Sequence, residues 1–118
     1  MIVDDEPDLT LSCRTSLEYH GFVVDTFNEP KEALSNFKSN YYDLVILDII
    51  MDDLNGFELY REIKKIDSNV KACFLTASNL YLEEIRSKEY DTLNQELFIR
   101  KPIETEKLIE KIKWLISV

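Results

Sequence analysis

Five polar side chains stand just behind short apolar runs of this sequence, and their types suit the binding of a cation and a phosphoryl group. They are Asp4, Asp5, Asp48, Thr76 and Lys101. Three or four apolar residues precede the acidic pair, Asp48 and Thr76, while one residue separates Lys101 from its run. Short apolar runs bounded by polar residues are typical of strands buried in a parallel sheet.

Ligands of open parallel sheets bind beyond the carboxyl ends of the strands. The sequence therefore predicts three carboxylates, a hydroxyl and an ammonium in one crevice. Carboxylates crowded together repel one another, and a hard divalent cation relieves the repulsion. Mg²⁺ suits a site of one or two carboxylates completed by water, phosphate oxygens and a backbone carbonyl.

A carboxylate beside such a cation can attack phosphorus and form an aspartyl phosphate. Asp48 is the best nucleophile, because it ends the central apolar run. Lys101 can pair with one phosphoryl oxygen, and the Thr76 hydroxyl can donate to another. Each residue alone also has an ordinary structural explanation, as a solvated acidic pair, a hydroxyl bonded to backbone or a surface lysine. The joint pattern favours the functional interpretation.

Alternating strand and helix patterns are expected to position these side chains. The predicted strands cover residues 1–3, 22–27, 43–48, 70–76 and 97–100. Four of the predicted helices cover about 7–20, 57–66, 80–90 and 104–117, and another, the second along the chain, has Pro30 in its first turn. Asn28 is the predicted N-cap of the second helix. This alternation favours an α/β, flavodoxin-like, doubly wound sheet of five parallel strands in the order 2-1-3-4-5, with five helices. The first strand is expected to be short.

Helical periodicity predicts which side chains face the core. They are Leu9, Cys13, Leu17, Ala33, Leu34, Phe37, Leu59, Ile63, Ile66, Leu108, Ile109, Ile112, Leu115 and Ile116. Trp114 falls opposite the apolar stripe of the last helix and is expected to be exposed. It could anchor a partner, or it could simply rest on the stems of Lys107 and Lys111.

The bulk properties restrict the classes of function. A chain of 118 residues is expected to form one domain, spanning residues 1–118. The net charge of −9 argues against direct binding of nucleic acid or of an anionic membrane. No stretch is long enough to span a membrane, and no secretory signal is visible. Cys13 and Cys73 are expected to be buried thiols, which fits the cytoplasm, and His20 a surface residue.

The motifs together resemble the response-regulator receiver domain of the CheY-like superfamily. The Asp4-Asp5 pair, Asp48 behind a hydrophobic strand, Thr76-Ala77 and Lys101-Pro102 match in order and spacing, and Gly56 matches eight residues after Asp48. The resemblance covers essentially the whole chain. It implies that Asp48 is the phosphoacceptor of a two-component phosphorelay and that the donor is a phosphohistidine on a sensor histidine kinase or phosphotransfer protein.

By the same resemblance, Asp5 and Asp48 ligate Mg²⁺ directly, Asp4 does so directly or through water, and the Ile50 main-chain carbonyl completes the protein ligands. Such a chain phosphorylates itself and slowly loses the phosphoryl group, so it need not be a turnover enzyme.

The family also implies a switch. Phe98 stands where the family carries an aromatic ring that rotates when the residue equivalent to Thr76 moves. This change would act on the face made by the fourth helix, the fifth strand and the last helix, where Trp114 would mark a partner surface and a phosphorylation-dependent homodimer is expected. The alternative is that Phe98 is simply a core residue.

Two other functions stay open at this stage. The chain could be a receiver-like module that binds partners without phosphorylation, although the intact Asp48, Thr76 and Lys101 argue against it. It could also be a phosphatase of the haloacid-dehalogenase type, but that family has an aspartate where this chain has Ile50. The sequence also departs from the receiver pattern at Asp52, where proline is usual, and over residues 91–96, where a Gly-Ala pair is usual.

Overall fold

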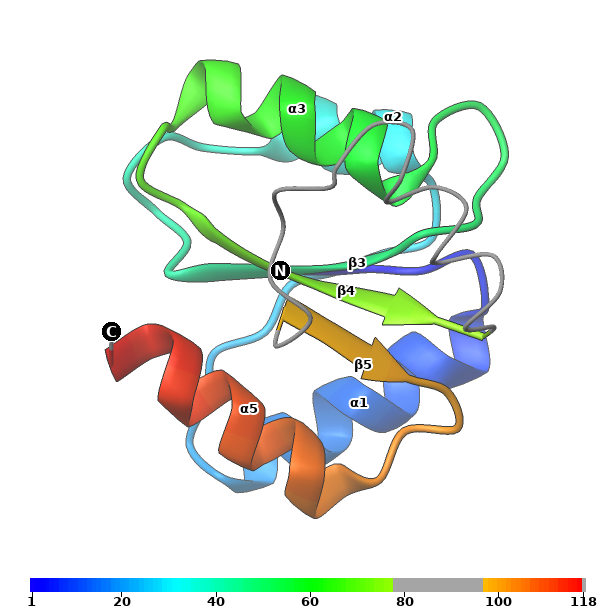
Figure 1. Ribbon diagram of the computed structural model, residues 1–118, viewed down its shortest axis with the longest axis vertical. Helices are drawn as coiled ribbons and strands as arrows, with labels where there is room; N and C mark the ends of the chain where they lie inside the picture. The colour runs from blue at the N-terminus through cyan, green and yellow to red at the C-terminus, as the bar shows by residue number, and fades with distance from the viewer. Residues whose placement is uncertain (78–96, 118) are drawn as a thin grey trace.

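A five-stranded parallel sheet lies between two layers of helices in the computed structural model, which describes residues 1–77 and 97–117 (Figure 1). The strands are β1 (Ile2–Val3), β2 (Thr26–Phe27), β3 (Leu44–Asp48), β4 (Lys71–Thr76) and β5 (Phe98–Arg100), and the helices are α1 (Pro7–Tyr19), α2 (Pro30–Asn36), α3 (Gly56–Ile66) and α5 (Thr105–Ser117). The strand order β2-β1-β3-β4-β5 confirms the predicted fold. The helix predicted over residues 80–90 lies outside the described residues.

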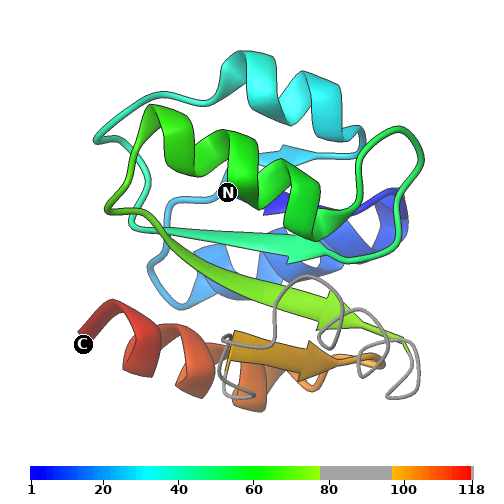
Figure 2. The ribbon, with the colours of Figure 1, turned by 45° about the horizontal axis from the view of Figure 1, so that its top comes forward.

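Helices α2 and α3 cover one face of the sheet, and α1 and α5 cover the other (Figures 1 and 2). Alternate residues of β3 supply the two cores. Val45 and Leu47 pack on the α2 and α3 side, whereas Leu44 and Ile46 pack on the α1 and α5 side. Because both faces are covered, β3 is an uninterrupted apolar run rather than an alternating one.

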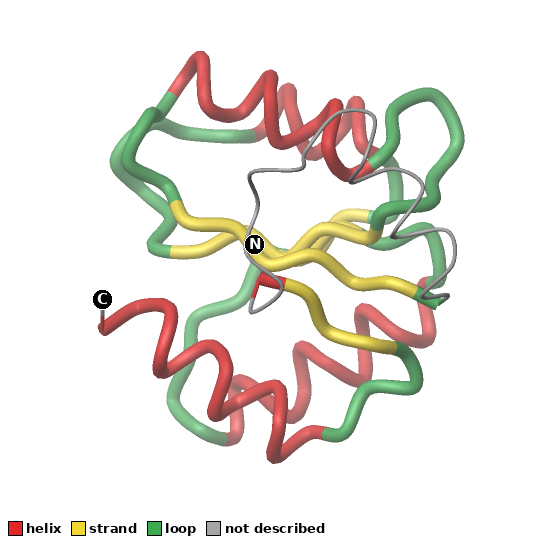
Figure 3. The backbone as a smooth tube through the Cα atoms, in the orientation of Figure 1, coloured by secondary structure: helices red, strands yellow, loops and turns green. Residues whose placement is uncertain are grey.

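All five strands are parallel, so their carboxyl ends lie at one edge of the sheet, where the strands continue into loops (Figure 3). Val3 pairs with Leu47, and Asp48 pairs with Leu75. Thr76 pairs with Arg100, the residue before Lys101. This register places five polar residues at the edge that the sequence predicts, namely Asp4, Asp5, Asp48, Thr76 and Lys101.

Strand β2 is shorter than predicted. Only Thr26 and Phe27 pair with β1, instead of the whole range 22–27. The reason lies in its neighbour, because β1 offers only Ile2 and Val3 for pairing.

The prediction that Asn28 caps α2 is wrong. The N-cap is Glu29, and the Asn28 amide instead donates to the Asp4 carbonyl oxygen at 2.9 Å and to Thr10 Oγ1 at 3.0 Å. Asn28 thus ties the loop after β2 to the turn between β1 and α1, close to the acidic pair.

Two predicted core residues lie largely outside the core. Ile66 is 44% exposed and Ile116 is 40% exposed, because each lies in the final turn of its helix, where no further turn flanks it. Trp114 is 45% exposed, as predicted. Cys13 and Cys73 are buried free thiols, which also agrees with the sequence.

His20 is exposed at the C-terminal end of α1, as expected, with its ring Nδ1 2.8 Å from the Ser16 carbonyl oxygen. Within the described residues, no helix is both long enough and apolar enough to cross a membrane.

Candidate active site

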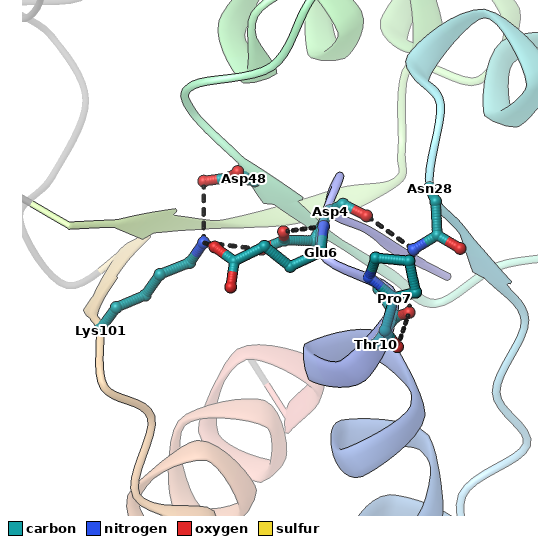
Figure 4. Close-up of polar contacts among 7 residues, drawn as sticks. All are labelled: Asp4, Glu6, Pro7, Thr10, Asn28, Asp48 and Lys101. Carbon is teal, nitrogen blue, oxygen red and sulfur yellow. Dashed lines mark hydrogen bonds and ion pairs between the residues drawn. The ribbon is translucent and has the colours of Figure 1, made fainter.

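The Lys101 ammonium lies among three carboxylates at the carboxyl edge of the sheet (Figure 4). Its Nζ is 2.9 Å from Asp4 Oδ2, 3.2 Å from Glu6 Oε1 and 3.5 Å from Asp48 Oδ1. The structure therefore brings together Asp4, Asp48 and Lys101, as the sequence predicts, and adds Glu6 to them.

Backbone pairing beyond the end of β5 places Lys101. Its N–H donates to the Thr76 carbonyl oxygen at 2.8 Å, so the lysine leaves the sheet beside the end of β4. Only 14% of its side chain is exposed. Burial alone would lower the pKa of this ammonium, but the contacts with Asp4 and Asp48 outweigh burial and raise it above the ordinary value.

Asp4 is completely buried and holds the turn that follows β1. Its Oδ1 accepts a hydrogen bond from the Glu6 backbone N–H at 2.9 Å. Its Oδ2 receives no hydrogen bond from the described residues, although it pairs with the Lys101 ammonium. Burial raises the pKa of this carboxyl above its usual value, and Lys101 opposes the rise.

Asp48 ends β3 with only 4% of its surface exposed. Burial is the main cause that raises the pKa of its carboxyl to about 6, and the neighbouring Asp4 carboxylate adds to the rise, while Lys101 opposes it. At neutral pH this carboxylate is ionised but poorly solvated. Perturbed carboxyls in a crevice are typical of functional sites.

The start of α3 packs directly on the backbone of Asp48. The Gly56 N–H donates to the Ile49 carbonyl oxygen at 2.9 Å. A Cβ at position 56 would clash with the Asp48 carbonyl oxygen and approach Ile49 Cα to 3.1 Å, so the position requires glycine. A capping box between Asn55 and Glu58 then begins the helix.

Three further residues of the predicted site have different environments. Ile50 is 49% exposed in the loop after β3. Thr76 is buried at the last position of β4. Phe98 is half-buried, and its ring centroid lies 5.6 Å from that of Phe74 and 6.1 Å from that of Phe57.

Carboxylates also gather at the start of α1. One oxygen from each of Asp4, Asp5 and Glu6 lies within 4.8 Å of the others. Asp48 is not part of this group and contacts the Lys101 ammonium instead. An all-oxygen donor set of this kind fits Mg²⁺.

The sequence alone did not point to Glu6. Its partner Lys101 is 95 residues away, and no local pattern distinguishes a glutamate that turns toward the crevice from one that faces solvent.

Residues 1–113 match the family model of the response regulator receiver domain. The chain belongs to this family. The response regulator SaeR of Staphylococcus aureus is 33% identical over 99% of the chain, which spans about half, 50%, of the length of this relative.

Solved receiver structures agree with this membership. The Thermotoga maritima response regulator TrrA, in complex with Mg²⁺ and BeF, is 37% identical, with a TM-score of 0.80 over 97% of this receiver domain and 95% of TrrA. The non-phosphorylated HemR receiver domain of Leptospira biflexa is 29% identical, with a TM-score of 0.82 over 99% and 92% of the two chains.

Proposed function

We propose that Asp48 accepts a phosphoryl group from a phosphohistidine on a sensor histidine kinase or phosphotransfer protein. The observation that carries this proposal is the buried Asp48 carboxylate, which ends the central strand 3.5 Å from the Lys101 ammonium. Family membership supports the reaction class. The transfer is mostly a matter of positioning and of neutralising charge, and this arrangement of buried charges suits both.

An Asp48 carboxylate oxygen attacks phosphorus in this reaction. The P–N bond of the donor phosphohistidine breaks, and its electron pair returns to the imidazole ring. The Lys101 ammonium pairs with one phosphoryl oxygen, and the Thr76 hydroxyl donates a hydrogen bond to another. Asp4 keeps Lys101 at the crevice while Asp48 is unphosphorylated, since their ion pair is buried.

Mg²⁺ would be held by Asp5, Asp48 and the Ile50 main-chain carbonyl, with Asp4 bound directly or through water. When bound, the ion neutralises the carboxylates and the charge of the transferring phosphoryl group. The convergence of the Asp4 and Asp5 carboxylates and the Mg²⁺–BeF complex of TrrA support a Mg²⁺ site at this edge.

Phosphorylation would switch a surface through Thr76 and Phe98. If Thr76 moves to a phosphoryl oxygen, the Phe98 ring can turn inward and change the face that includes β5 and α5. The alternative is a static Phe98 that stays packed on Phe57 and Phe74. Crystal structures with and without beryllofluoride separate the two, because only the switch predicts different Phe98 rotamers.

The wider assignment follows from this role. The chain would act in the cytoplasm as one receiver domain over residues 1–118, without direct contact to nucleic acid or membrane. Trp114 on α5 would belong to the surface of a phosphorylation-dependent homodimer.

Incubation with acetyl phosphate and Mg²⁺, followed by intact mass, tests the function. A receiver gains one phosphoryl group, and the adduct decays slowly without repeated release of phosphate. A module that acts without phosphorylation gains no mass, and a phosphatase releases phosphate over many turnovers. Either of these two outcomes would contradict the proposal.

A further inference from the structure

Glu6 occupies the N-cap position of α1 but does not cap the helix. Among the described residues its side chain forms no capping hydrogen bond, and it reaches instead to the Lys101 ammonium at 3.2 Å (Figure 4). Ser, Thr, Asp and Asn are the side chains that usually bond the free N–H groups of the first turn, and Glu is not among them. A glutamate that turns away from these N–H groups is not explained by the needs of its own helix.

The same chain contains an internal comparison for Glu6. Glu29 is the N-cap of α2, also exposed, also followed by proline and also without a capping hydrogen bond among the described residues. No ion pair involves Glu29 in the part of the chain that the structure describes. The Glu-Pro pair therefore suffices to start a helix, and the contact between Glu6 and Lys101 is an additional feature.

Three carboxylates share a single ammonium in this arrangement. Asp4 and Asp48 are buried, but the Glu6 side chain is 62% exposed. Asp4 and Glu6 both lie on the β1–α1 side of the crevice, so their contacts draw Lys101 away from Asp48, to which its distance is the longest of the three. A phosphoryl group on Asp48 would need the same ammonium.

We propose that Glu6 is a positioning residue, which holds Lys101 toward α1 while Asp48 is unphosphorylated and competes with the phosphoryl group for the ammonium. This role rests on the proposed function. Of the three carboxylates, Glu6 is the one that Lys101 can leave at the lowest cost in free energy, because exposed ion pairs are weak. Glu6 would thus lower the affinity of the crevice for an anion without blocking it.

Beryllofluoride affinity tests the competition. The ion is an inert substitute for the phosphoryl group, and its dissociation constant is measured with Mg²⁺ saturating for each variant. Glu6→Gln keeps the size of the side chain and removes its charge. It should tighten beryllofluoride binding roughly two- to fivefold, the range expected for an exposed ion pair.

Two matched variants separate a specific contact from a general change of charge. Glu29→Gln removes a charge from the equivalent position of α2, and Asp8→Asn removes one from the first turn of α1 itself. Both should leave the dissociation constant within error of the original chain. An equal gain in Asp8→Asn and Glu6→Gln would overturn the proposal, because ordinary repulsion of the anion would then explain it.

The side-chain nitrogen of Lys101 gives a second readout, which does not depend on phosphoryl chemistry. Its ¹⁵Nζ signal, assigned by its loss in Lys101→Met, should shift in Glu6→Gln without any ligand and stay fixed in Glu29→Gln. An unchanged signal in Glu6→Gln would also overturn the proposal.

Failure of the proposed function and failure of the role of Glu6 give different results. If the original chain binds no beryllofluoride, the proposed function is wrong, and so is the competition between Glu6 and the phosphoryl group. Normal binding with identical affinity in Glu6→Gln contradicts only the role of Glu6.

Discussion

The Lys101 ammonium lies 2.9 Å from the Asp4 carboxylate, although the two residues come from distant parts of the chain. Asp4 is completely buried, so its charge depends on this partner. The same ammonium is 3.5 Å from Asp48. The pair thus supports the fold and also keeps a cation ready at the acceptor, which links stability to function at one residue.

Removal of Lys101 should therefore destabilise the protein. Lys101→Met leaves the Asp4 carboxylate buried without its cation, and we expect a loss of about 2–3 kcal/mol in the free energy of unfolding at pH 7 without metal. Urea unfolding measures it. Lys107→Met is the control, because Lys107 is exposed and pairs only with exposed Glu104 among the described residues, so its loss should be near zero. Equal stability of the two variants would contradict the structural role of Lys101.

Ionisation of Asp48 should make the stability of the folded chain depend on pH. Burial and Asp4 raise the pKa of this carboxyl in the folded chain from 3.8 to about 6. The folded state therefore binds this proton more tightly than the unfolded state, and stability is lost as pH rises from about 4 to 6.

Asp48→Asn removes that penalty. Without metal it should be more stable than the original chain by about 1–3 kcal/mol at pH 7, and the difference should vanish near pH 4. Thermal unfolding across this range measures the difference, with Asp52→Asn, which removes an exposed carboxylate, as the control. If the difference in stability stays constant from pH 4 to 7, ionisation of Asp48 does not destabilise the folded chain.

Mg²⁺ should bind the crevice without any phosphate, because carboxylates converge there. We expect a dissociation constant on the order of 1 mM, as for an open and water-rich magnesium site. In an NMR titration the amide shifts should centre on Asp4, Asp5, Asp48 and Ile50. Asp5→Asn should weaken binding, whereas Asp53→Asn, in the acidic loop after β3, should change it little. Shifts centred on Asp52 and Asp53, without Asp5 and Asp48, would place the ion elsewhere.

Trp114 should contribute to self-association after activation. It is 45% exposed on α5, and Trp is favoured as an interface anchor. Beryllofluoride should promote a dimer, and Trp114→Ala should weaken it by roughly tenfold in dissociation constant. Sedimentation measures this, with Tyr19→Ala, an 86% exposed aromatic of α1, as the control. If the chain stays monomeric in every state, Trp114 merely rests on lysine stems.

The sequence was sufficient to predict the strand order and the edge at which the polar residues meet. Each of β3 and β4 is a short apolar run that ends in a polar residue, and the carboxyl ends of parallel strands share one edge. Asp48, Thr76 and Lys101 could therefore be placed without coordinates. Their roles in phosphorylation stay predictions.

Other features depend on contacts that no local pattern encodes. Asn28 has the side chain of a helix cap, but it bonds to Asp4 and Thr10, which the fold brings near it. The hydrophobic periodicity of α3 and α5 includes Ile66 and Ile116 and so predicts that both are buried. Both are exposed, because the final turn of a helix has fewer neighbours than the turns before it. The contact of Glu6 with Lys101 likewise depends on the fold, because the segments after β1 and β5 leave the sheet at the same edge.

Phosphorylation at Asp48 can be checked by chemical identification of the modified residue. An aspartyl phosphate is reduced by borohydride to homoserine, and peptide mass spectrometry then locates the change. After treatment with acetyl phosphate and Mg²⁺, homoserine should appear at position 48 of the original chain and nowhere in Asp48→Asn. Homoserine at position 4 or 5 of the original chain, or none at all, would contradict phosphorylation at Asp48.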